Sequence, residues 1–557
     1  MFRKFFNLLK LDKKEISYLY LFAIVTSIIS FSLPLGIQGV IGIVSVGQIT
    51  TSWYVLLILL IAGIAGVSLL QILQIQIVEI LQQRLFVRVA FDFADRALKI
   101  KHNSNRYLPE EIIKFLEVTN IQKSLSKILL DLSAALLQIL LGVILVSLYH
   151  SLFAIVGILL IVITVVILSL SGKSGLETSI IESKYKYKVM NWLLELGNLS
   201  QALKFYKDND FHFIKTDKYV QNYIEYRNKH FKILKSQFVS LLFLKVVFTL
   251  LLFVVGGILV VNGSISIGEF VGSELVIVLI IHAIEKIVLS TEVVYDVLTA
   301  VDKIDGVMNL ELDSEENTNI TLTTPLTIVL QKIIVEINHK VVLNNISLNL
   351  YPNQKIMLCG SGNSGKSTLS KTIAGLQNFQ EGSILYNNVP QVNLSKQDIY
   401  KQIALIESKS DVFKGTILEN ILIGAPMDIS KLNVLAKDLG ILDLIQEFDE
   451  GWHHIVLPNG INITESLAFK ILIMRALFHH PETLIIDADI DFLPQSDMLE
   501  IWNTLKKNYQ GTLLLVSSNR TLAKDFDNII VLDKGNIVFN DSYQALIQTK
   551  YITFFNL

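Results

Sequence analysis

Six apolar runs of about twenty residues constrain this chain more than any other feature, because an α-helix of that length crosses the hydrocarbon core of a membrane. Composition agrees: 52% of the 557 residues are hydrophobic and only 18% are charged, which is too apolar for a soluble protein of this size. We therefore expect a membrane-embedded, multi-pass protein with a soluble part. The runs lie within residues 16–44, 53–75, 128–148, 153–170, 238–261 and 268–289.

The distribution of Lys and Arg predicts the orientation of these spans. The connections 46–52, 149–151 and 262–267 contain neither residue, whereas the segments 84–127 and 173–235 are rich in both. Because segments rich in Lys and Arg stay on the inner side, we expect these long segments and both termini to be cytoplasmic and the protein to lie in the cytoplasmic (inner) membrane.

The basic, amphipathic opening MFRKFFNLLKLDKK is expected to form an interfacial helix ahead of the first span. The apolar run behind it is too long for a signal peptide and lacks a small-residue cleavage site, so no targeting peptide is expected to be removed. Both long inner segments keep helical periodicity, as in residues 81–100 and 182–206, which predicts helices that continue beyond the membrane as stalks. The alternative is a loop that folds separately.

Hydrophobicity falls and polar residues gather after residue 310, which is typical of a linker. This divides the chain into a transmembrane domain (1–310), a linker (311–325) and a soluble domain (326–557). The soluble domain opens with short β-rich runs, and the last of these leads into GSGNSGKST and then a helical stretch.

The pattern G-x-x-x-x-G-K-[ST] between a strand and a helix predicts ATP binding, since a glycine-rich loop at a helix N-terminus presents many backbone N–H donors to a triphosphate. Lys366 is expected to reach the β- and γ-phosphates. Ser367 and Asp487, the latter at the end of the run LIID, are expected to hold Mg²⁺. The ATP-binding residues predicted in this way are Gly360, Ser361, Gly362, Asn363, Ser364, Gly365, Lys366, Ser367 and Thr368.

Other classes of partner are disfavoured. A net charge of −2 provides no basic field for nucleic acid. The single cysteine, Cys359, excludes an internal disulfide and a multi-cysteine zinc site, and the two adjacent histidine pairs lack spaced partners for a metal.

Six spans with stalks followed by such a domain resemble the exporter-type ATP-binding cassette (ABC) transporters in their half-transporter form. The resemblance covers nearly the whole chain and includes DVFKGTILENI (411–421), MRALFHHPETLIID (474–487) and IIVLDKGNIV (529–538). The chain is similar to bacterial exporters of peptides or proteins, some of which carry an N-terminal cysteine protease. With no cysteine ahead of the first span, we expect that protease to be absent.

The resemblance implies a multi-domain membrane protein, with a six-helix α transmembrane domain plus an α/β phosphate-loop nucleotide-binding domain. It also implies a homodimer, or a heterodimer with another ABC half-transporter, and accessory export proteins as further candidate partners.

Several positions depart from the family's pattern. The catalytic glutamate expected after Asp487 is Ala488, the switch histidine is Asn519, and the glutamine expected before DVFKG is Ser408. The aromatic residue that stacks on adenine has no counterpart, with Ile337 nearest to its place. No catalytic residue is assigned, because loss of a positioned general base typically removes about 10² to 10⁴ of rate.

A carboxylate further along, Asp489 or Asp491, is the alternative base. The family's signature segment LSGGQ reads ITESL here, so Thr464, Glu465 and Ser466 form a signature-like site. Thr464 keeps a hydroxyl, but Glu465 brings a carboxylate toward the γ-phosphate position of a partner subunit. Two like charges about 4 Å apart repel by roughly 4 kcal/mol at an effective dielectric of 20.

These features predict an exporter half-subunit that binds ATP and moves a peptide, protein or amphipathic molecule, with weak or partner-dependent hydrolysis. The alternative is a pseudo-ATPase scaffold or regulator that transports nothing.

Ionisable residues interrupt the last two spans. Glu274, His282 and Glu285 fall within an arc of about 80° on the sixth span, and Lys245 on the fifth lies at a depth similar to that of Glu285. Because an unpaired charge in lipid is costly, we expect Lys245 and Glu285 to pair directly, between chains or through water, unless both reach the inner interface by snorkelling.

Two turns interrupt the stalks. Leu108, Pro109 and Glu110 start a short helix after a break, and KFYKDNDFHF supplies a second break. The resemblance implies that such turns dock on the nucleotide domain near the loop holding Ser408. The alternative is a plain cytosolic loop.

Overall fold

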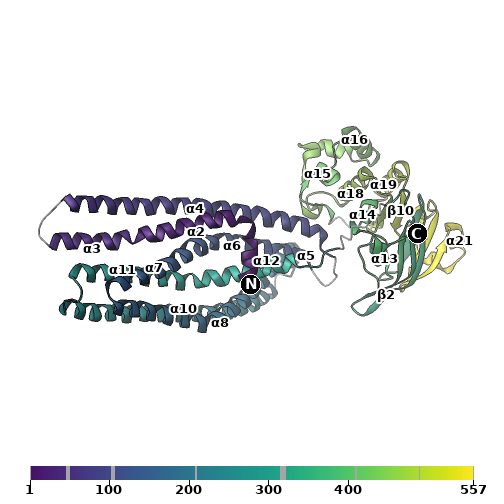
Figure 1. Ribbon diagram of the computed structural model, residues 1–557. Helices are drawn as coiled ribbons and strands as arrows, with labels where there is room; N and C mark the ends of the chain where they lie inside the picture. The colour runs from purple at the N-terminus through teal and green to yellow at the C-terminus, as the bar shows by residue number, and fades with distance from the viewer. Residues whose placement is uncertain are drawn as a thin grey trace. The chain divides into compact units, whose positions relative to one another are not determined.

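The computed structural model describes residues 2–45, 51–101, 107–206, 210–313, 322–407, 411–488 and 490–555. Two predicted positions, Ser408 and Asp489, lie outside the described residues. The chain divides into two compact units, Met1–Glu311 and Leu312–Leu557, each of which is described by itself (Figure 1).

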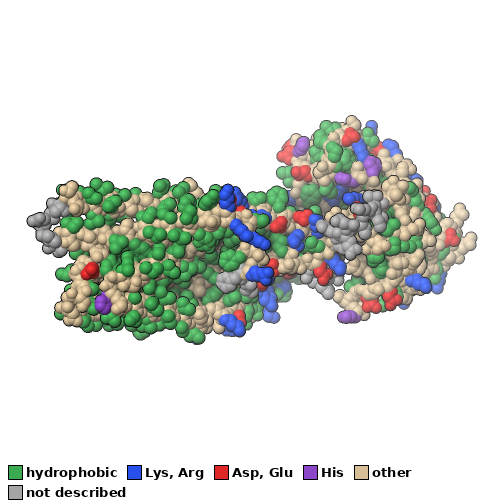
Figure 2. All heavy atoms as spheres, in the orientation of Figure 1, with side chains coloured by type: hydrophobic (Ala, Val, Ile, Leu, Met, Phe, Trp, Pro, Cys, Tyr) green, Lys and Arg blue, Asp and Glu red, His purple; other side chains and the backbone are tan. Residues whose placement is uncertain are grey.

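The first unit is a bundle of helices. Six helical segments are long and apolar enough to cross a membrane, and each contains one of the predicted runs: Lys10–Val44, Thr51–Lys99, Leu108–Tyr149, Ser151–Asn198, Phe211–Val261 and Ile267–Met308. The prediction of six spans is therefore confirmed. On the face shown in Figure 2, hydrophobic side chains cover most of this bundle, and Lys and Arg gather toward one end of it.

The helices of the first unit have the following bounds: α1 (Phe2–Leu8), α2 (Lys13–Ser30), α3 (Ser32–Ser45), α4 (Thr51–Lys99), α5 (Leu108–Ile112), α6 (Glu117–Ser126), α7 (Ser133–Tyr149), α8 (Ser151–Asn198), α9 (Ser200–Lys204), α10 (Phe211–Val261), α11 (Ile267–Leu289) and α12 (Thr291–Met308), with a π-helical turn, η3 (Lys127–Leu132), between α6 and α7.

Local sequence explains the main break in the first span. Helices α2 and α3 are separate at Phe31 because Pro34 has no N–H to donate, and its ring would clash with the carbonyl of Ser30 in a continuous helix. By contrast, α4, α8 and α10 run unbroken for 49, 48 and 51 residues, far longer than a span requires. These three helices thus continue well past the predicted apolar runs.

The N-terminal segment forms the predicted helix, and it packs on the protein's own stalk. Lys4 of α1 makes ion pairs with Asp302 and Asp305 of α12, at 3.3 and 2.7 Å. Phe5 and Leu9 are both buried. Apolar packing and two ion pairs thus hold this helix against α12.

The second unit is an α/β domain with strands β1 (Ile328–Ile337), β2 (Lys340–Leu350), β3 (Lys355–Gly360), β4 (Glu381–Tyr386), β5 (Val389–Pro390), β6 (Ile403–Ile406), β7 (Gly415–Thr416), β8 (Ile455–Val456), β9 (Thr483–Ile486), β10 (Thr512–Val516), β11 (Asn528–Asp533) and β12 (Asn536–Asp541). Its helices are α13 (Lys366–Ile373), α14 (Lys396–Gln402), α15 (Ile417–Leu422), α16 (Ile429–Asp438), α17 (Leu442–Glu447), α18 (Glu465–His479), α19 (Gln495–Asn508), α20 (Arg520–Ala523) and α21 (Tyr543–Ile547).

The main sheet has the order β12-β11-β3-β10-β9-β6 and is parallel from β11 to β6. Alternate residues of β3 enter two different apolar cores, with Met357 on one face and Ile356 and Leu358 on the other. Because parallel strands end at one edge of a sheet, the segments that follow β3, β9 and β10 come together there. That edge carries the candidate site.

Candidate nucleotide-binding site

The loop between β3 and α13 has the backbone shape that the phosphate-loop pattern requires. Gly365 has a φ of +102°, and a Cβ added there would lie 2.8 Å from the Leu343 side chain and 3.0 Å from the carbonyl of Val342. Asn363 adopts the left-handed conformation, with a φ of +60°. The loop therefore closes against β2 and leads directly into the N-terminus of α13.

Polar groups in this loop suit an anionic ligand. The Lys366 ammonium donates to the carbonyls of Gly360 and Ser361, both at 2.9 Å, so it lies across the loop. The Ser364 hydroxyl is buried and has no hydrogen-bond partner within the described residues. This set of groups fits the phosphates of ATP: an unpaired buried hydroxyl, a lysine over the loop and the free N–H groups at a helix N-terminus.

Asp487 meets the phosphate loop from the neighbouring part of the sheet. It directly follows β9, and its backbone N–H donates to the carbonyl of Ile406 at 2.8 Å. Burial raises the pKa of the Asp487 carboxyl to about 6, while a hydrogen bond from the Ser367 hydroxyl acts in the opposite direction. The structure thus brings together the two residues that the sequence assigns to Mg²⁺.

A hydroxyl and a carboxylate are oxygen donors of the kind that Mg²⁺ prefers, with water and phosphate oxygens completing its shell. Within the described residues, no group of three or more His, Cys, Asp or Glu side chains is arranged to hold a metal ion. A single carboxylate and a hydroxyl, with phosphate and water oxygens, are a donor set that suits Mg²⁺ bound together with a nucleotide.

The positions expected to be catalytic carry other contacts. Ala488, directly after Asp487, presents only a methyl group. The Asn519 side chain caps α20, since its Oδ1 accepts hydrogen bonds from the N–H groups of Thr521 and Leu522 at 2.9 and 3.3 Å. Its amide oxygen is thereby used by its own helix, and its amide nitrogen donates to the sulfur of Met498 on α19 at 3.3 Å.

Asp491, the alternative base, already accepts three hydrogen bonds. Its carboxylate binds the Ser517 hydroxyl at 2.5 Å and the N–H and hydroxyl of Ser518 at 2.7 and 2.9 Å. Sequence reasoning missed this contact, although an acidic residue and a Ser-Ser pair placed after neighbouring strands were a visible signal.

Comparisons with known proteins agree with this arrangement. Residues 343–489 match the family described as ABC transporter. A bacterial Atm1-family ABC exporter, solved with ATP bound, superposes with a TM-score of 0.87 over 97% of both chains at 15% sequence identity. The chain has the fold of an ABC exporter half-transporter. The predicted fold class is thereby confirmed, with membrane helices and an ABC ATP-binding domain on one chain.

Two bacterial relatives are similar to this chain over part of their length. The lactococcin-G-processing and transport ATP-binding protein LagD of Lactococcus lactis subsp. lactis is 24% identical over 312 residues, which cover 54% of this chain and 44% of the relative. The alpha-hemolysin translocation ATP-binding protein HlyB of Proteus vulgaris is 26% identical over 305 residues, covering 52% and 42%. The chain matches less than half the length of these two curated relatives.

The signature-like segment lies at the start of α18. Thr464 is the N-cap and accepts a hydrogen bond from the N–H of Leu467 at 3.2 Å. Glu465 is exposed in the first turn. Ser466 hydrogen-bonds to Asp497, which also pairs with the buried Lys470. The Thr464 hydroxyl is thus used within the helix cap, and a carboxylate stands exposed beside it.

The ionisable residues of the last two spans form a small cluster. The Lys245 ammonium lies 3.5 Å from a carboxylate oxygen of Glu285, and His282 Nδ1 lies 3.5 Å from the same oxygen. Direct pairing within one chain is therefore the arrangement in this structure. Glu274 stands eleven residues before Glu285, about 16 Å away along the helix, so it is not part of the cluster.

Short helices begin or end at the two predicted stalk turns. Helix α5 begins at Leu108 with Pro109 in its first turn. Helix α9 ends at Lys204 and α10 starts at Phe211, with residues 207–209 outside the described part. Ile337 lies at the end of β1, beside the tip of the hairpin with β2.

Proposed function

We propose that this protein is a half-subunit of an ABC exporter that binds Mg-ATP and hydrolyses it negligibly by itself. The observation that carries the proposal is the contrast at the edge of the main sheet. The binding loop and the Ser367–Asp487 pair are intact, whereas Ala488 follows Asp487 where the resemblance calls for a base.

Weak binding is part of the proposal. No aromatic residue stands where the family stacks adenine, and Ile337 is the residue nearest to that place. The adenine ring therefore lacks a contact that is worth about 1 to 3 kcal/mol in other base-stacking sites. Lys366 and the N-terminus of α13 then supply most of the affinity through the phosphates.

Transport would depend on a partner. A peptide, protein or amphipathic molecule is the cargo class that the relatives' names favour, since LagD and HlyB are named for lactococcin-G transport and alpha-hemolysin translocation. We infer insertion in the cytoplasmic membrane with both termini inside, and a second half-transporter whose intact residues drive the cycle. The exposed Glu465 disfavours closure over ATP at the site that this chain's signature-like segment would cap.

The test measures binding and turnover separately on purified full-length protein. We expect Mg-ATP to bind saturably and Lys366→Ala to abolish that binding, while the hydrolysis rates of the two proteins are indistinguishable. Introducing Ala488→Glu together with Asn519→His should raise turnover at least about tenfold, since a positioned base contributes about 10² to 10⁴. Wild-type turnover near 10 per second that depends on Lys366 would contradict the proposal.

A regulatory role without transport is the second candidate, favoured by the exposed Glu465 at the start of α18. Affinity purification separates the two. An intact half-transporter among the co-purifying proteins supports transport, whereas an unrelated membrane protein as the stable partner supports regulation.

A further inference from the structure

A polar cavity of about 450 Å³ lies between α6, α8, α10 and α12, in the stalk part of the first unit. Its volume falls in the range of about 300 to 1,000 Å³ that is common for small-molecule sites. Such sites are usually lined mainly by apolar side chains. Here all thirteen lining residues are polar, and seven of them are charged. A lining of this kind favours a strongly polar ligand.

One end of the cavity is negative. Arg227 of α10 is shared between Glu182 of α8, at 3.3 Å, and Glu292 of α12, at 3.4 Å, which leaves this group with a net charge of −1. Asp296, one turn after Glu292 on α12, also lines the cavity. No hydrogen bond or ion pair of Asp296 is present within the described residues, so its charge adds to that of the group.

The other end is positive. The buried Glu117 of α6 lies 3.1 Å from the ammonium of Lys303 on α12 and 3.7 Å from that of Lys186 on α8, giving a net charge of +1. Asn120 donates a further hydrogen bond to Glu117 at 2.6 Å. Lys123 of α6 lines the cavity as well, and no ion pair of its side chain is present in the described ranges.

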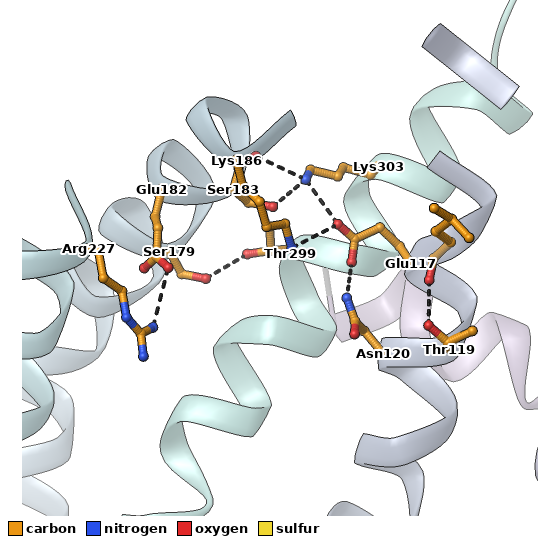
Figure 3. Close-up of polar contacts among 11 residues, drawn as sticks. Glu117, Thr119, Asn120, Ser179, Glu182, Ser183, Lys186, Arg227, Thr299 and Lys303 are labelled. Atoms are coloured by element: carbon orange, nitrogen blue, oxygen red, sulfur yellow. Dashed lines mark hydrogen bonds and ion pairs between the residues drawn. The ribbon is translucent and has the colours of Figure 1, made fainter. Parts of the chain in front are cut away.

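Figure 3 shows the two groups on either side of a bridge between α8 and α12. Arg227 and Glu182 lie on one side and Glu117 and Lys303 on the other, with Ser179 and Thr299 between them. The hydroxyls of Ser179 and Thr299 are 3.1 Å apart. Lys186, one turn after Glu182 on α8, also interacts with Glu182 and Asp296, so it acts on both groups. Asp296 adds negative charge to the first group, while Lys123 adds positive charge to the second.

We propose that this cavity binds a small zwitterion, a molecule that carries both an ammonium group and a carboxylate or phosphate. The ammonium is held near Glu182, Glu292 and Asp296, and the anion near Lys123 and Lys186. A ligand with charge of one sign would be repelled at one end, whereas a zwitterion complements both. The inference is independent of the proposed ATPase properties, since every residue that it uses belongs to the membrane unit.

Two sources offer this chemistry: a free amino acid or short peptide, and an ethanolamine phospholipid headgroup. Isothermal titration of the full-length protein in phosphatidylglycerol nanodiscs distinguishes them, with L-alanyl-L-alanine and glycerophosphoethanolamine as probes. Tighter binding of the dipeptide assigns the site to the first source, and tighter binding of glycerophosphoethanolamine assigns it to the second.

Capped probes test the role of each charge. N-acetylation removes the ammonium of the dipeptide and C-amidation removes its carboxylate, and each change should lower affinity at least about tenfold, as expected for a lost hydrogen bond between charged groups. The proposal is overturned if neither zwitterion binds saturably, or if both capped dipeptides bind as tightly as the parent.

A variant pair ties the binding to this cavity. Asp296→Asn removes a charge without breaking an ion pair found in the structure, so the protein should remain folded, which an unchanged thermal midpoint would verify. The variant should bind either zwitterion at least about tenfold more weakly. Glu225→Gln is the matched control, because Glu225 also lies on a stalk helix but pairs with Lys229 at 2.6 Å outside the cavity. Unaltered binding by folded Asp296→Asn would also overturn the proposal.

Discussion

Lys470 is the most deeply buried charged side chain near the signature-like segment. It is 3% exposed, and its ammonium lies 3.1 Å from Asp497 and 2.6 Å from Glu500. The two carboxylates come from α19, so this contact fixes α18 against α19. The side chains of Asp497 and Glu500 are 22% and 43% exposed, which makes the group asymmetric: the cation is buried and the anions are partly hydrated.

The asymmetry predicts unequal costs of mutation. Replacing both carboxylates, as in Asp497→Asn with Glu500→Gln, leaves an uncompensated buried ammonium, which typically costs about 3 to 5 kcal/mol. Lys470→Met removes the buried charge and keeps most of the apolar stem. The two carboxylates are partly hydrated and need no buried cation to compensate them, so we expect the free energy of unfolding to fall by only about 1 kcal/mol. The triple variant should recover most of the stability lost in the carboxylate double variant.

The assay is thermal unfolding of the full-length protein, followed through the transition of the nucleotide-binding unit. For a unit the size of residues 312–557, 1 kcal/mol corresponds to about 2 to 4 °C, so a loss of 3 kcal/mol lowers the midpoint by about 6 to 12 °C. Lys470→Met should lower it by less than half as much. A carboxylate double variant as stable as Lys470→Met would refute the reasoning.

Three further predictions concern the site and the membrane unit. Because the pKa of Asp487 is raised from 3.8 to about 6, the folded protein binds more protons than the unfolded chain between these pH values, and stability falls as pH rises through that window. Asp487→Asn should therefore stabilise the nucleotide-free protein at about pH 8 and have little effect near about pH 4. Equal effects at both pH values would contradict the burial argument. Lys245→Ala and Glu285→Ala should show a coupling energy of at least about 0.5 kcal/mol in a double-mutant cycle of stability, whereas strictly additive losses would reject the pair. Cysteines introduced at Glu110 and Ser408 should crosslink in the assembled transporter. The only native cysteine, Cys359, interferes little because it is buried and its thiol pKa is raised to about 11. Consistent failure to crosslink in folded protein would contradict the docking hypothesis.

Local patterns in the sequence predicted much of the architecture. The six spans follow from run length, and the phosphate loop follows from glycine spacing between an apolar run and a helical one. The meeting of Ser367 with Asp487 was predictable too, because the ends of parallel strands share one edge of a sheet.

Contacts between distant segments were not predictable in this way. Glu117 and Lys303 are 186 residues apart, and nothing in the sequence around either indicates that α6 and α12 place them 3.1 Å from each other. Lys470 sits among apolar residues of α18, and only the packing of α19 shows that two carboxylates compensate its charge. Helical periodicity identifies the face of a helix on which a residue lies, but it does not identify the helix that covers that face.

The contacts of Asp491 bear on one of the alternative bases that the sequence leaves open. A general base needs geometry first, with an oxygen free to accept the proton of the attacking water. Both carboxylate oxygens of Asp491 instead accept hydrogen bonds from Ser517 and Ser518, so the side chain links η8 (Ile490–Phe492) to the segment after β10. Removing the Asp491 side chain would therefore loosen that segment. With its oxygens occupied in this way, Asp491 does not serve as a base beside Asp487. Of the two alternative bases, Asp491 is thereby disfavoured, and Asp489 lies outside the described residues.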